Sequence, residues 1–213
     1  MQIAGSQLVL SATDLSAFHE CAHRTVLDLA ALSGTLERPG ENRIERQMLE
    51  KRGLEHEARV LEHFRASGRT VVTISRQPGG DSVSREAALA TEAAMAAGAE
   101  LIYQGVLYDG AWLGRPDFLL KTDGVSRFGD YQYEVADAKL AREAKGAAVL
   151  QLCVYTDRLE RVQKALPEYF WIVPRSKPIE PMPLRVADYM AYYRSAKRRF
   201  EGFVGMEREP PYP

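Results

Sequence analysis

The sequence predicts an α/β fold in which helices cover both faces of a small mixed sheet. Three observations support this class. Strand-like runs follow one another over 100–141, a segment with helical periodicity follows at 143–163, and another strand-like run covers 168–174. The predicted central order is helix, three strands, helix, strand, with helical additions before and after it.

Two helices are predicted in the first part of the chain. Ser11 or Thr13 can cap a first helix that ends at Gly34. A second, long helix is expected over 41–66, with charges between apolar residues at helical spacing, namely Ile44, Met48, Leu54, Ala58, Leu61 and Phe64.

A strand, a helix and a meander are predicted next. The β-branched run at 70–75 predicts a strand, and the Ala-rich segment 84–99 predicts a helix. The strand-like runs at 100–108, 111–121 and 130–141 then predict an antiparallel meander. Its turns are expected at two dipeptides of the kind that favours hairpins, Asp109-Gly110 and Asp123-Gly124.

The last third of the chain predicts two helices and a strand. A helix is expected over 143–163, and the run EYFWIVP at 168–174 predicts the fourth strand. A Pro-rich connector then leads to an amphipathic helix over 186–204. The inner side of the first of these helices is expected to carry Leu150, Val154 and Leu159.

Composition is typical of a globular protein with one domain. The chain has 213 residues, of which 46% are hydrophobic and 27% charged, so neither disorder nor a fibrous fold is indicated. We expect a single domain made of an N-terminal helical part (1–40), a core (41–175) and a connector with a C-terminal helix (176–213).

The sequence contains neither a targeting signal nor a strong net charge. No apolar run of about 18 residues exists, which predicts no membrane partner, and the start lacks the features of a signal peptide. Two distant cysteines, Cys21 and Cys153, suit a reducing compartment, so a cytoplasmic location is expected. The net charge of −1 means that a nucleic-acid site would have to arise from local clusters of Lys and Arg.

Charged residues in two predicted strands suggest a metal site. In YEVADAKLA, Asp137 and Lys139 are two residues apart and project from the same face. Asp117 lies in the preceding predicted strand. Two carboxylates held close together repel each other unless a divalent cation such as Mg²⁺ accepts oxygens from both. A structural ion pair is the alternative for Asp137 and Lys139 taken alone.

Two helices carry further candidates. Glu57 falls within the apolar stripe of the long helix and His56 borders it, so Glu57 needs a partner, either a metal or a salt bridge. Gln151 and Tyr155 stand one helical turn apart, directly after the acidic strand. Their side chains can form hydrogen bonds to a phosphate or to a neighbouring base.

These motifs together resemble the RecB-like branch of the PD-(D/E)xK nuclease superfamily, over roughly residues 41–175. The motifs are Arg-Pro-Asp ending at Asp117, Asp-x-Lys at 137–139, Gly-x-x-His-Glu at 53–57 and Gln-x-x-x-Tyr at 151–155. The resemblance implies a restriction-endonuclease-like core. That core is a mixed sheet flanked by helices, which matches the predicted order of elements.

The resemblance also implies roles for single residues. Asp117 and Asp137 would be metal ligands for Mg²⁺ or Mn²⁺, Lys139 the catalytic lysine, and His56 or Glu57 the helix ligand. Gln151 and Tyr155 would be the signature of the branch and part of its catalytic site. The family often has three residues between Gly and His where this chain has two, which leaves the choice between His56 and Glu57 open.

Relatives in this branch often carry an iron–sulfur cluster, held by one early and three late cysteines. FHECAHR resembles the early motif and contains Cys21, but these 213 residues do not supply four thiolates. The cluster is therefore not expected within this chain alone. We expect either a protein without the cluster or a fragment of a longer chain, in which such a module can be joined to a helicase.

Other charged groups have simpler alternatives. Arg142 and Lys145 follow the acidic strand and are placed to meet a DNA backbone. The basic run RSAKRRF at 194–200 predicts a solvated helix face, with phosphate binding as the alternative. The spacing of His19 and His23 around Cys21 suits zinc, but no second cluster completes such a site.

Three functions follow as expectations. The first is a Mg²⁺- or Mn²⁺-dependent DNA nuclease, an exonuclease on single-stranded DNA with a role in DNA repair, in which substrate and direction come from the resemblance alone. The second is a catalytically silent DNA-binding or scaffold module with the same fold. The third is a different metal-dependent hydrolase.

Overall fold

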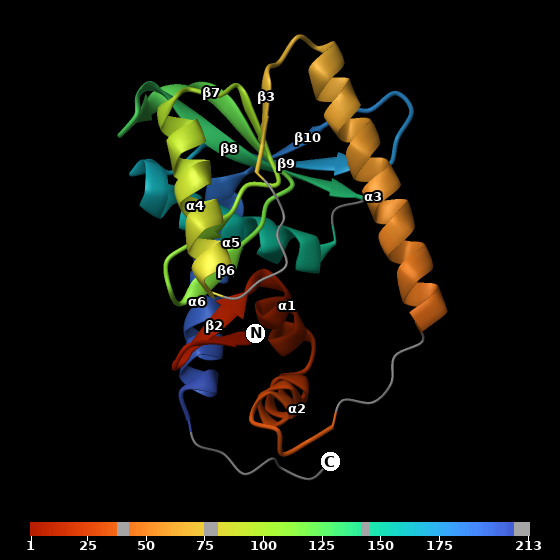
Figure 1. The fold of residues 1–213 in the computed structure, drawn as a ribbon, viewed down its shortest axis with the longest axis vertical. Helices are drawn as coiled ribbons and strands as arrows, with labels where there is room; N and C mark the ends of the chain where they lie inside the picture. Colours follow the sequence, from red (N-terminus) through yellow and green to blue (C-terminus); the bar gives the residue numbers. More distant parts are fainter. Residues whose placement is uncertain (38–42, 75–80, 142–144, 207–213) are drawn as a thin grey trace.

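The protein is a mixed α/β fold built on two sheets, shown in Figure 1. The computed structural model describes residues 1–37, 43–74, 81–141 and 145–206. Its helices are α1 (Ala12–Glu20), α2 (Ala22–Leu32), α3 (Arg43–Ala66), α4 (Asp81–Ala96), α5 (Gly146–Gln163) and α6 (Val186–Val204). Its strands are β1 (Gln2–Ala4), β2 (Gln7–Ser11), β3 (Val71–Thr73), β4 (Leu101–Tyr103), β5 (Leu107–Tyr108), β6 (Trp112–Gly114), β7 (Phe118–Ser126), β8 (Gly129–Lys139), β9 (Tyr169–Pro174) and β10 (Met182–Arg185).

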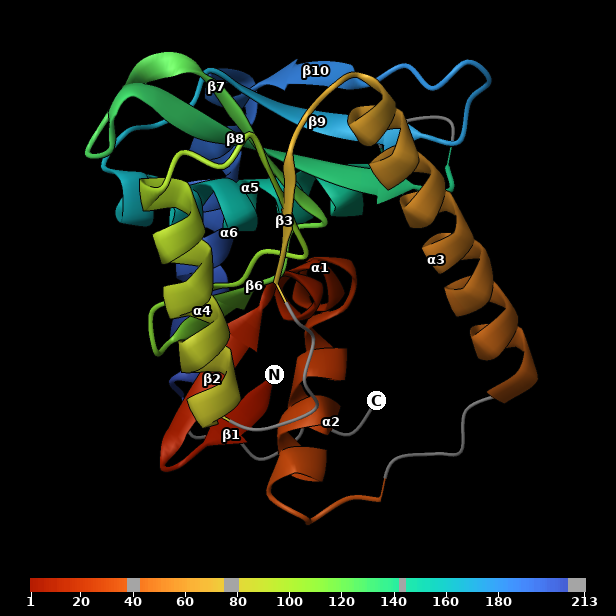
Figure 2. The same ribbon diagram turned by 45° about the horizontal axis from the view of Figure 1, so that its top comes forward.

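The larger sheet has the strand order β10-β9-β8-β7-β4-β3. Strands β4, β7 and β8 are antiparallel neighbours, whereas β9 runs parallel to β8 after the crossover helix α5. Along the chain, α3, β4, β7, β8, α5 and β9 follow the predicted order of helix, three strands, helix and strand, but β3 and α4 lie between α3 and β4, and β5 and β6 lie between β4 and β7. Figure 2 shows the smaller sheet, of order β1-β2-β6-β5, lying with α1 and α2 below the larger one.

Two apolar clusters lie on opposite faces of the larger sheet, because side chains alternate along each strand. Tyr133 and Val135 of β8 contribute to the cluster that contains α5 and α6. Ala136 of β8 contributes to the cluster that contains α3. Asp137 and Lys139 have the same parity as Val135 and therefore point toward α5.

The beginning of the chain differs from the prediction. Residues 1–40 are not only helical, because β1 and β2 form a hairpin and β2 pairs with β6. Ser11 is the N-cap of α1, where its N–H and Oγ–H donate to Asp14 Oδ2 at 2.8 and 2.7 Å. The single helix predicted up to Gly34 is wrong, since extended backbone at Cys21 (φ −159°) separates α1 from α2.

The predicted apolar stripe of α3 is partly wrong. Leu54 is 56% exposed and Met48 is 53% exposed, and Ala58 is exposed as well. The burial of Ile44 lies outside the described side chains. The helix packs on β4, β7, β8 and β9 through the last part of its length, and its buried side chains there are His56, Glu57, Val60, Leu61 and Phe64. Two polar residues occupy this face because they find partners in the neighbouring strands.

The meander is divided between the two sheets. Gln104 has a positive φ of 60° and separates β4 from β5, so the run at 100–108 is two strands. The run at 111–121 likewise splits into β6 and β7. Strand β7 continues past the expected turn at Asp123-Gly124, and the hairpin turns at 127–128 instead. Gly124 (φ 148°) lies at a register shift, where a Cβ would come within 2.6 Å of the Gln132 side chain.

The second half of the chain agrees more closely with the prediction. Strands β8 and β9 and helix α6 lie where they were expected, and Leu150, Val154 and Leu159 of α5 are buried. The Pro-rich connector contains the additional strand β10, which pairs with β9. Across the residues that the structure describes, no helix combines the length and apolar character that a membrane crossing requires.

An ionic cluster joins α5 to α6. Asp157 of α5 accepts hydrogen bonds from Tyr193 Oη and Lys197 Nζ of α6, both at 2.7 Å, and from Arg158 at 2.6 Å. Arg158 itself is 3% exposed and pairs with Asp109. Withdrawal from water would raise the pKa of Asp157, but Lys197, Tyr193 and Arg158 outweigh it and lower that pKa to about 2.

We therefore predict that this cluster stabilises the fold at neutral pH but not in acid. A carboxyl with a lowered folded-state pKa contributes stability above its ordinary pKa, and this is lost as the pH falls from about 4 to about 2. Asp157→Asn should lower the free energy of unfolding by about 2 kcal/mol near pH 7. Urea denaturation followed by circular dichroism should show the difference from wild type shrinking over that acid range.

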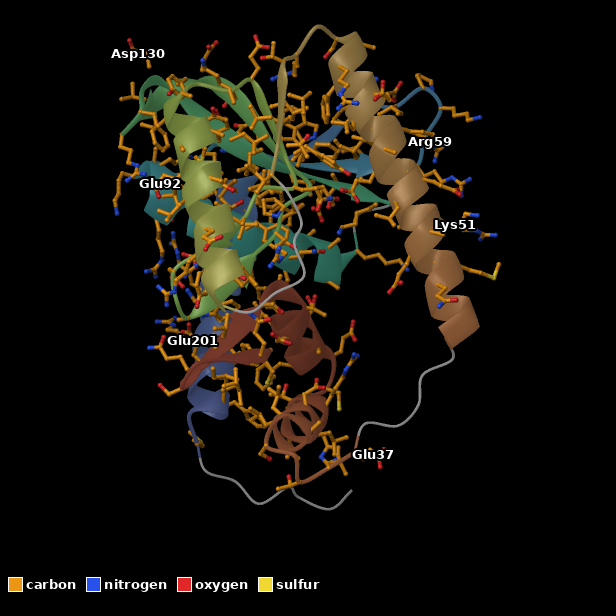
Figure 3. All side chains as sticks on the ribbon, in the orientation of Figure 1. Glu37, Lys51, Arg59, Glu92, Asp130 and Glu201 are labelled. Carbon is orange, nitrogen blue, oxygen red and sulfur yellow. The ribbon has the colours of Figure 1, made fainter. Side chains whose placement is uncertain are left out.

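The matched control is Asp130→Asn, at the exposed start of β8 (Figure 3). It should change the free energy of unfolding by less than about 0.5 kcal/mol at both ends of the pH range. An equal loss in the two variants, or a loss in Asp157→Asn that persists at pH 2, would contradict this role of the cluster.

Candidate functional site

Two aspartates face each other where β7 and β8 pair. The register matches Phe118 with Ala136, so Asp117, one residue before β7, lies opposite Asp137. The Asp117 N–H donates to Asp137 Oδ1 at 3.2 Å, and the Ala138 N–H donates to Asp117 Oδ2 at 2.9 Å. Each carboxylate is therefore held by the backbone of the other strand. The prediction that put Asp117 inside a strand is off by one residue, because β7 begins at Phe118.

Lys139 completes the charged group on this face of β8. Its Nζ forms an ion pair with Asp137 Oδ2, and it donates a hydrogen bond to Gln151 Oε1 at 2.8 Å. The Lys139 side chain is 24% exposed, whereas that of Asp137 is 2% exposed. Among the described residues, Asp137 Oδ2 meets no donor in good hydrogen-bond geometry. The ion pair is therefore what compensates its burial.

Helix α5 supplies a relay behind Lys139. Gln151 Nε2 donates to Tyr155 Oη at 2.7 Å, so Lys139, Gln151 and Tyr155 form one chain of hydrogen bonds. Tyr155 is 6% exposed, and burial raises the pKa of its hydroxyl, which keeps the group neutral. Gly114 of β6 makes room for the ring, since a Cβ there would lie 3.0 Å from Tyr155 Cδ1. Gln151 and Tyr155 were predicted to stand one helical turn apart, and in the structure they also contact each other directly.

His56 and Glu57 of α3, which the sequence left as alternative metal ligands, make different contacts in the structure. His56 Nε2 lies 3.0 Å from the carbonyl oxygen of Val173 in β9. Because a carbonyl only accepts, this nitrogen must carry the proton. Glu57 instead accepts a hydrogen bond from Gln104 Nε2 and lies close enough to Asp117 to affect its titration. Glu57 is therefore the helix residue that joins the acidic group, while His56 anchors α3 to β9.

The charges at this site shift two pKa values. Withdrawal from water raises the pKa of Asp117 well above its ordinary value, and the nearby carboxylates of Asp137 and Glu57 add to the effect. Lys139 and the Ala138 N–H act in the opposite direction without cancelling it. Burial by itself would lower the pKa of Lys139, but the carboxylates of Asp137, Asp117 and Glu57 raise it. Lys139 is therefore protonated at neutral pH.

Gln104 is a site residue that sequence reasoning missed. It is 8% exposed, it lies at the break between β4 and β5, and its amide holds Glu57. Its backbone N–H also donates to the Asp117 carbonyl at 2.8 Å. A polar residue followed by glycine within ELIYQGVLY was the available signal that the strand ends there.

The other residues that the sequence singled out lie outside this acidic group. Lys145 precedes α5 and is exposed, and it lines a pocket of about 330 Å³ together with Lys139 and Gln151. Arg142 lies outside the described residues. Cys21 is an exposed free thiol, and Cys153 is buried, which raises the pKa of its thiol to about 12.

The donor atoms of the site suit a hard divalent cation. Three carboxylates, of Asp117, Asp137 and Glu57, offer oxygen ligands of the kind that Mg²⁺ and Mn²⁺ accept. Within 1–37, 43–74, 81–141 and 145–206, however, no group of three or more His, Cys, Asp or Glu side chains has the arrangement of a metal centre. The chemistry fits the ion, and the side chains would have to adjust around it.

Comparison with known proteins adds no identity: no family model matches the chain, and no curated protein has a significant sequence match to it.

We predict that His56 contributes to stability by anchoring α3. His56→Ala removes the donor to the buried Val173 carbonyl and leaves a cavity, which should lower the free energy of unfolding by about 2 kcal/mol. Urea denaturation measures this change.

The control is His63→Ala, two helical turns further along α3, where the side chain is half-buried and its ring contacts Phe64. This variant should change the free energy of unfolding by less than about 1 kcal/mol. Equal stability of His56→Ala and wild type would contradict the anchoring role.

Proposed function

We propose that the protein is a divalent-metal-dependent nuclease that hydrolyses phosphodiester bonds in DNA. The observation that carries the proposal is the reciprocal hold of Asp117 and Asp137 by each other's backbone, beside Lys139. Glu57 adds a third carboxylate from α3. Three acids around one lysine repel one another, which destabilises the fold. Metal-dependent phosphoryl transfer would explain why such an arrangement is present.

The topology supports the same proposal. The order α3, β4, β7, β8, α5 and β9, with β9 parallel to β8, is what a restriction-endonuclease-like core requires. The residues at its acidic end are those through which the sequence resembles the RecB-like branch of the PD-(D/E)xK superfamily. We therefore propose this core for the described residues from α3 to β9.

Asp117, Asp137 and Glu57 are the residues that would hold the Mg²⁺ or Mn²⁺ ion. When bound, such an ion polarises a phosphoryl oxygen and acidifies a coordinated water. The backbone N–H groups of Asp117 and Ala138 keep the two aspartates in place. In addition, Gln104 holds Glu57 at the edge of this group.

Lys139 acts as a charged donor in this proposal. Its ammonium group pairs with Asp137 and donates to Gln151, so its role is to orient the attacking water and to neutralise charge on the phosphoryl group. Gln151 accepts a hydrogen bond from Lys139 Nζ and is itself held by Tyr155. The relay therefore restricts where the ammonium group can point.

The finer parts of the proposal rest on the resemblance. They are attack from an end, preference for single-stranded DNA, a role in DNA repair and association with a helicase domain or subunit. A cytoplasmic location is proposed because both cysteines are free thiols.

A silent DNA-binding module is the second candidate. The observation in its favour is that Lys139 already neutralises Asp137 through an ion pair, in a site whose side chains are not arranged as a metal centre across the described residues. Such a module would bind DNA without divalent ions and would not cleave it.

The decisive experiment follows end-labelled single- and double-stranded DNA on denaturing gels with Mn²⁺, Mg²⁺ or EDTA. We expect metal-dependent cleavage, and we expect Asp117→Asn, Asp137→Asn and Lys139→Ala each to lower its rate about 100-fold or more. Calorimetry should show that Asp117→Asn and Glu57→Gln weaken Mn²⁺ binding, which tests the ligand set apart from turnover.

The matched control is Asp123→Asn, an exposed acid on β7, the strand that follows Asp117, and this variant should cleave like wild type. Circular dichroism checks that each variant is folded. Wild-type cleavage rates in the three site variants would exclude this site. Absence of cleavage by the folded wild-type protein with any of the ions would favour the silent module.

A further inference from the structure

A second pocket at the end of β8 is lined by basic side chains. Its volume is about 750 Å³, and its walls carry Arg59 of α3 together with Arg175 and Lys177 of the segment that follows β9. Leu140, Pro174 and Ser176 complete the lining. The three basic residues come from parts of the sequence more than 100 positions apart, so only the folded chain brings them to one pocket.

The anchor between α3 and β9 explains why these charges converge. His56 donates to the carbonyl of Val173, which fixes this part of α3 against the end of β9. Arg59 follows His56 by three residues, close to one helical turn. Arg175 follows Val173 by two residues. Figure 1 shows the segment after β9 running beside α3, and Figure 3 shows Arg59 on the same side.

The basic pocket is adjacent to the candidate catalytic site. Lys139 is paired with Pro174 in the parallel register of β8 and β9, so Arg175 comes one residue beyond the partner of Lys139. Neighbouring strands lie about 4.8 Å apart. Leu140 lines both this pocket and the smaller pocket that contains Lys139 and Gln151. The two pockets thus meet at the end of β8.

Within the described part of the chain, no ion pair neutralises the charge of this pocket. Arg59, Arg175 and Lys177 are exposed, and none of them forms an ion pair with any residue in the described part of the chain. By contrast, Arg65, Arg127 and Arg158 all pair with acids. Since the whole chain has a net charge of −1, these three side chains are a local concentration of positive charge without an ion-pair partner among the residues that the structure describes.

We propose that this pocket binds backbone phosphates of the DNA strand next to the bond that is cut. This inference rests on the proposed function and extends it, because it assigns the binding of the flanking strand to Arg59, Arg175 and Lys177. Three separated charges on two walls suit successive phosphates of a strand better than one compact anion. Being exposed, the side chains can reach a backbone without contacting the bases, so binding should not depend on base sequence.

The test measures binding of a fluorescein-labelled single-stranded oligonucleotide by fluorescence anisotropy, in EDTA and over a series of salt concentrations. For Arg175→Ala/Lys177→Ala we expect the salt slope to fall by about 1.4, because each lost contact contributes about 0.7. This corresponds to binding about 20-fold weaker near 0.1 M salt. Arg59→Ala, on the opposite wall, should weaken binding in the same direction.

The matched control is Arg194→Ala/Arg198→Ala, which removes two exposed positive charges from α6. Helix α6 and helix α3 lie on opposite sides of the molecule in both ribbon views (Figures 1 and 2). Binding by this control should stay within about two-fold of wild type. An equal loss in the control, no binding by the wild type, or displacement of the oligonucleotide by equimolar inorganic phosphate would overturn the proposal.

Failure of the pocket and failure of the nuclease activity give different results. Binding that is lost in Arg175→Ala/Lys177→Ala, with no cleavage by the wild type, supports the pocket and contradicts the proposed catalysis. Cleavage by the wild type with unchanged KM and unchanged DNA affinity in that variant supports the catalysis and overturns the pocket.

Discussion

The antiparallel pairing of β7 with β8 is the contact on which the site depends. It sets Asp117 opposite Asp137 and lets each backbone hold the other carboxylate through an N–H group. A shift of one residue in this register would move Asp137 and Lys139 to the other face of the sheet. The long apolar runs of both strands prevent that shift, because they are buried on both faces: Phe118 and Leu120 on the α3 side, Leu119 and Val135 on the α5 side.

Electrostatic strain at this point is distributed over several elements. Asp117, Asp137 and Glu57 repel one another, and this repulsion adds to the burial that raises the pKa of Asp117. Lys139 offsets part of this repulsion. Although burial opposes it, the same carboxylates raise the pKa of Lys139. Gln104 and Gln151 then hold the outer members of the group. Such an arrangement is less stable than an apolar one of the same size, so its presence is itself a sign of function.

The helices on the two faces of the sheet have different tasks. Helix α5 closes the main core and positions Gln151 and Tyr155 behind the lysine. Helix α3 covers the other face, supplies Glu57 and is joined to β9 through His56. That last contact also fixes the basic pocket, because it sets Arg59 beside the segment that follows Pro174. One hydrogen bond between a helix and a strand thus connects the acidic site to its positively charged neighbourhood.

Local periodicity determined β8, α5, β9 and α6 and part of the site. Alternation along β8 placed Asp137 and Lys139 on one face, and helical spacing placed Gln151 one turn from Tyr155. Both relations follow from backbone geometry within one element, so no distant contact can change them. Tertiary structure alone decided which residues of different helices and strands contact one another. Packing placed Glu57, and not His56, beside Asp117, and it placed Gln104 against Glu57. It also divided the meander between two sheets and brought the basic residues together at the end of β8. These outcomes depend on register and packing between segments far apart in the chain, which no short window of sequence contains.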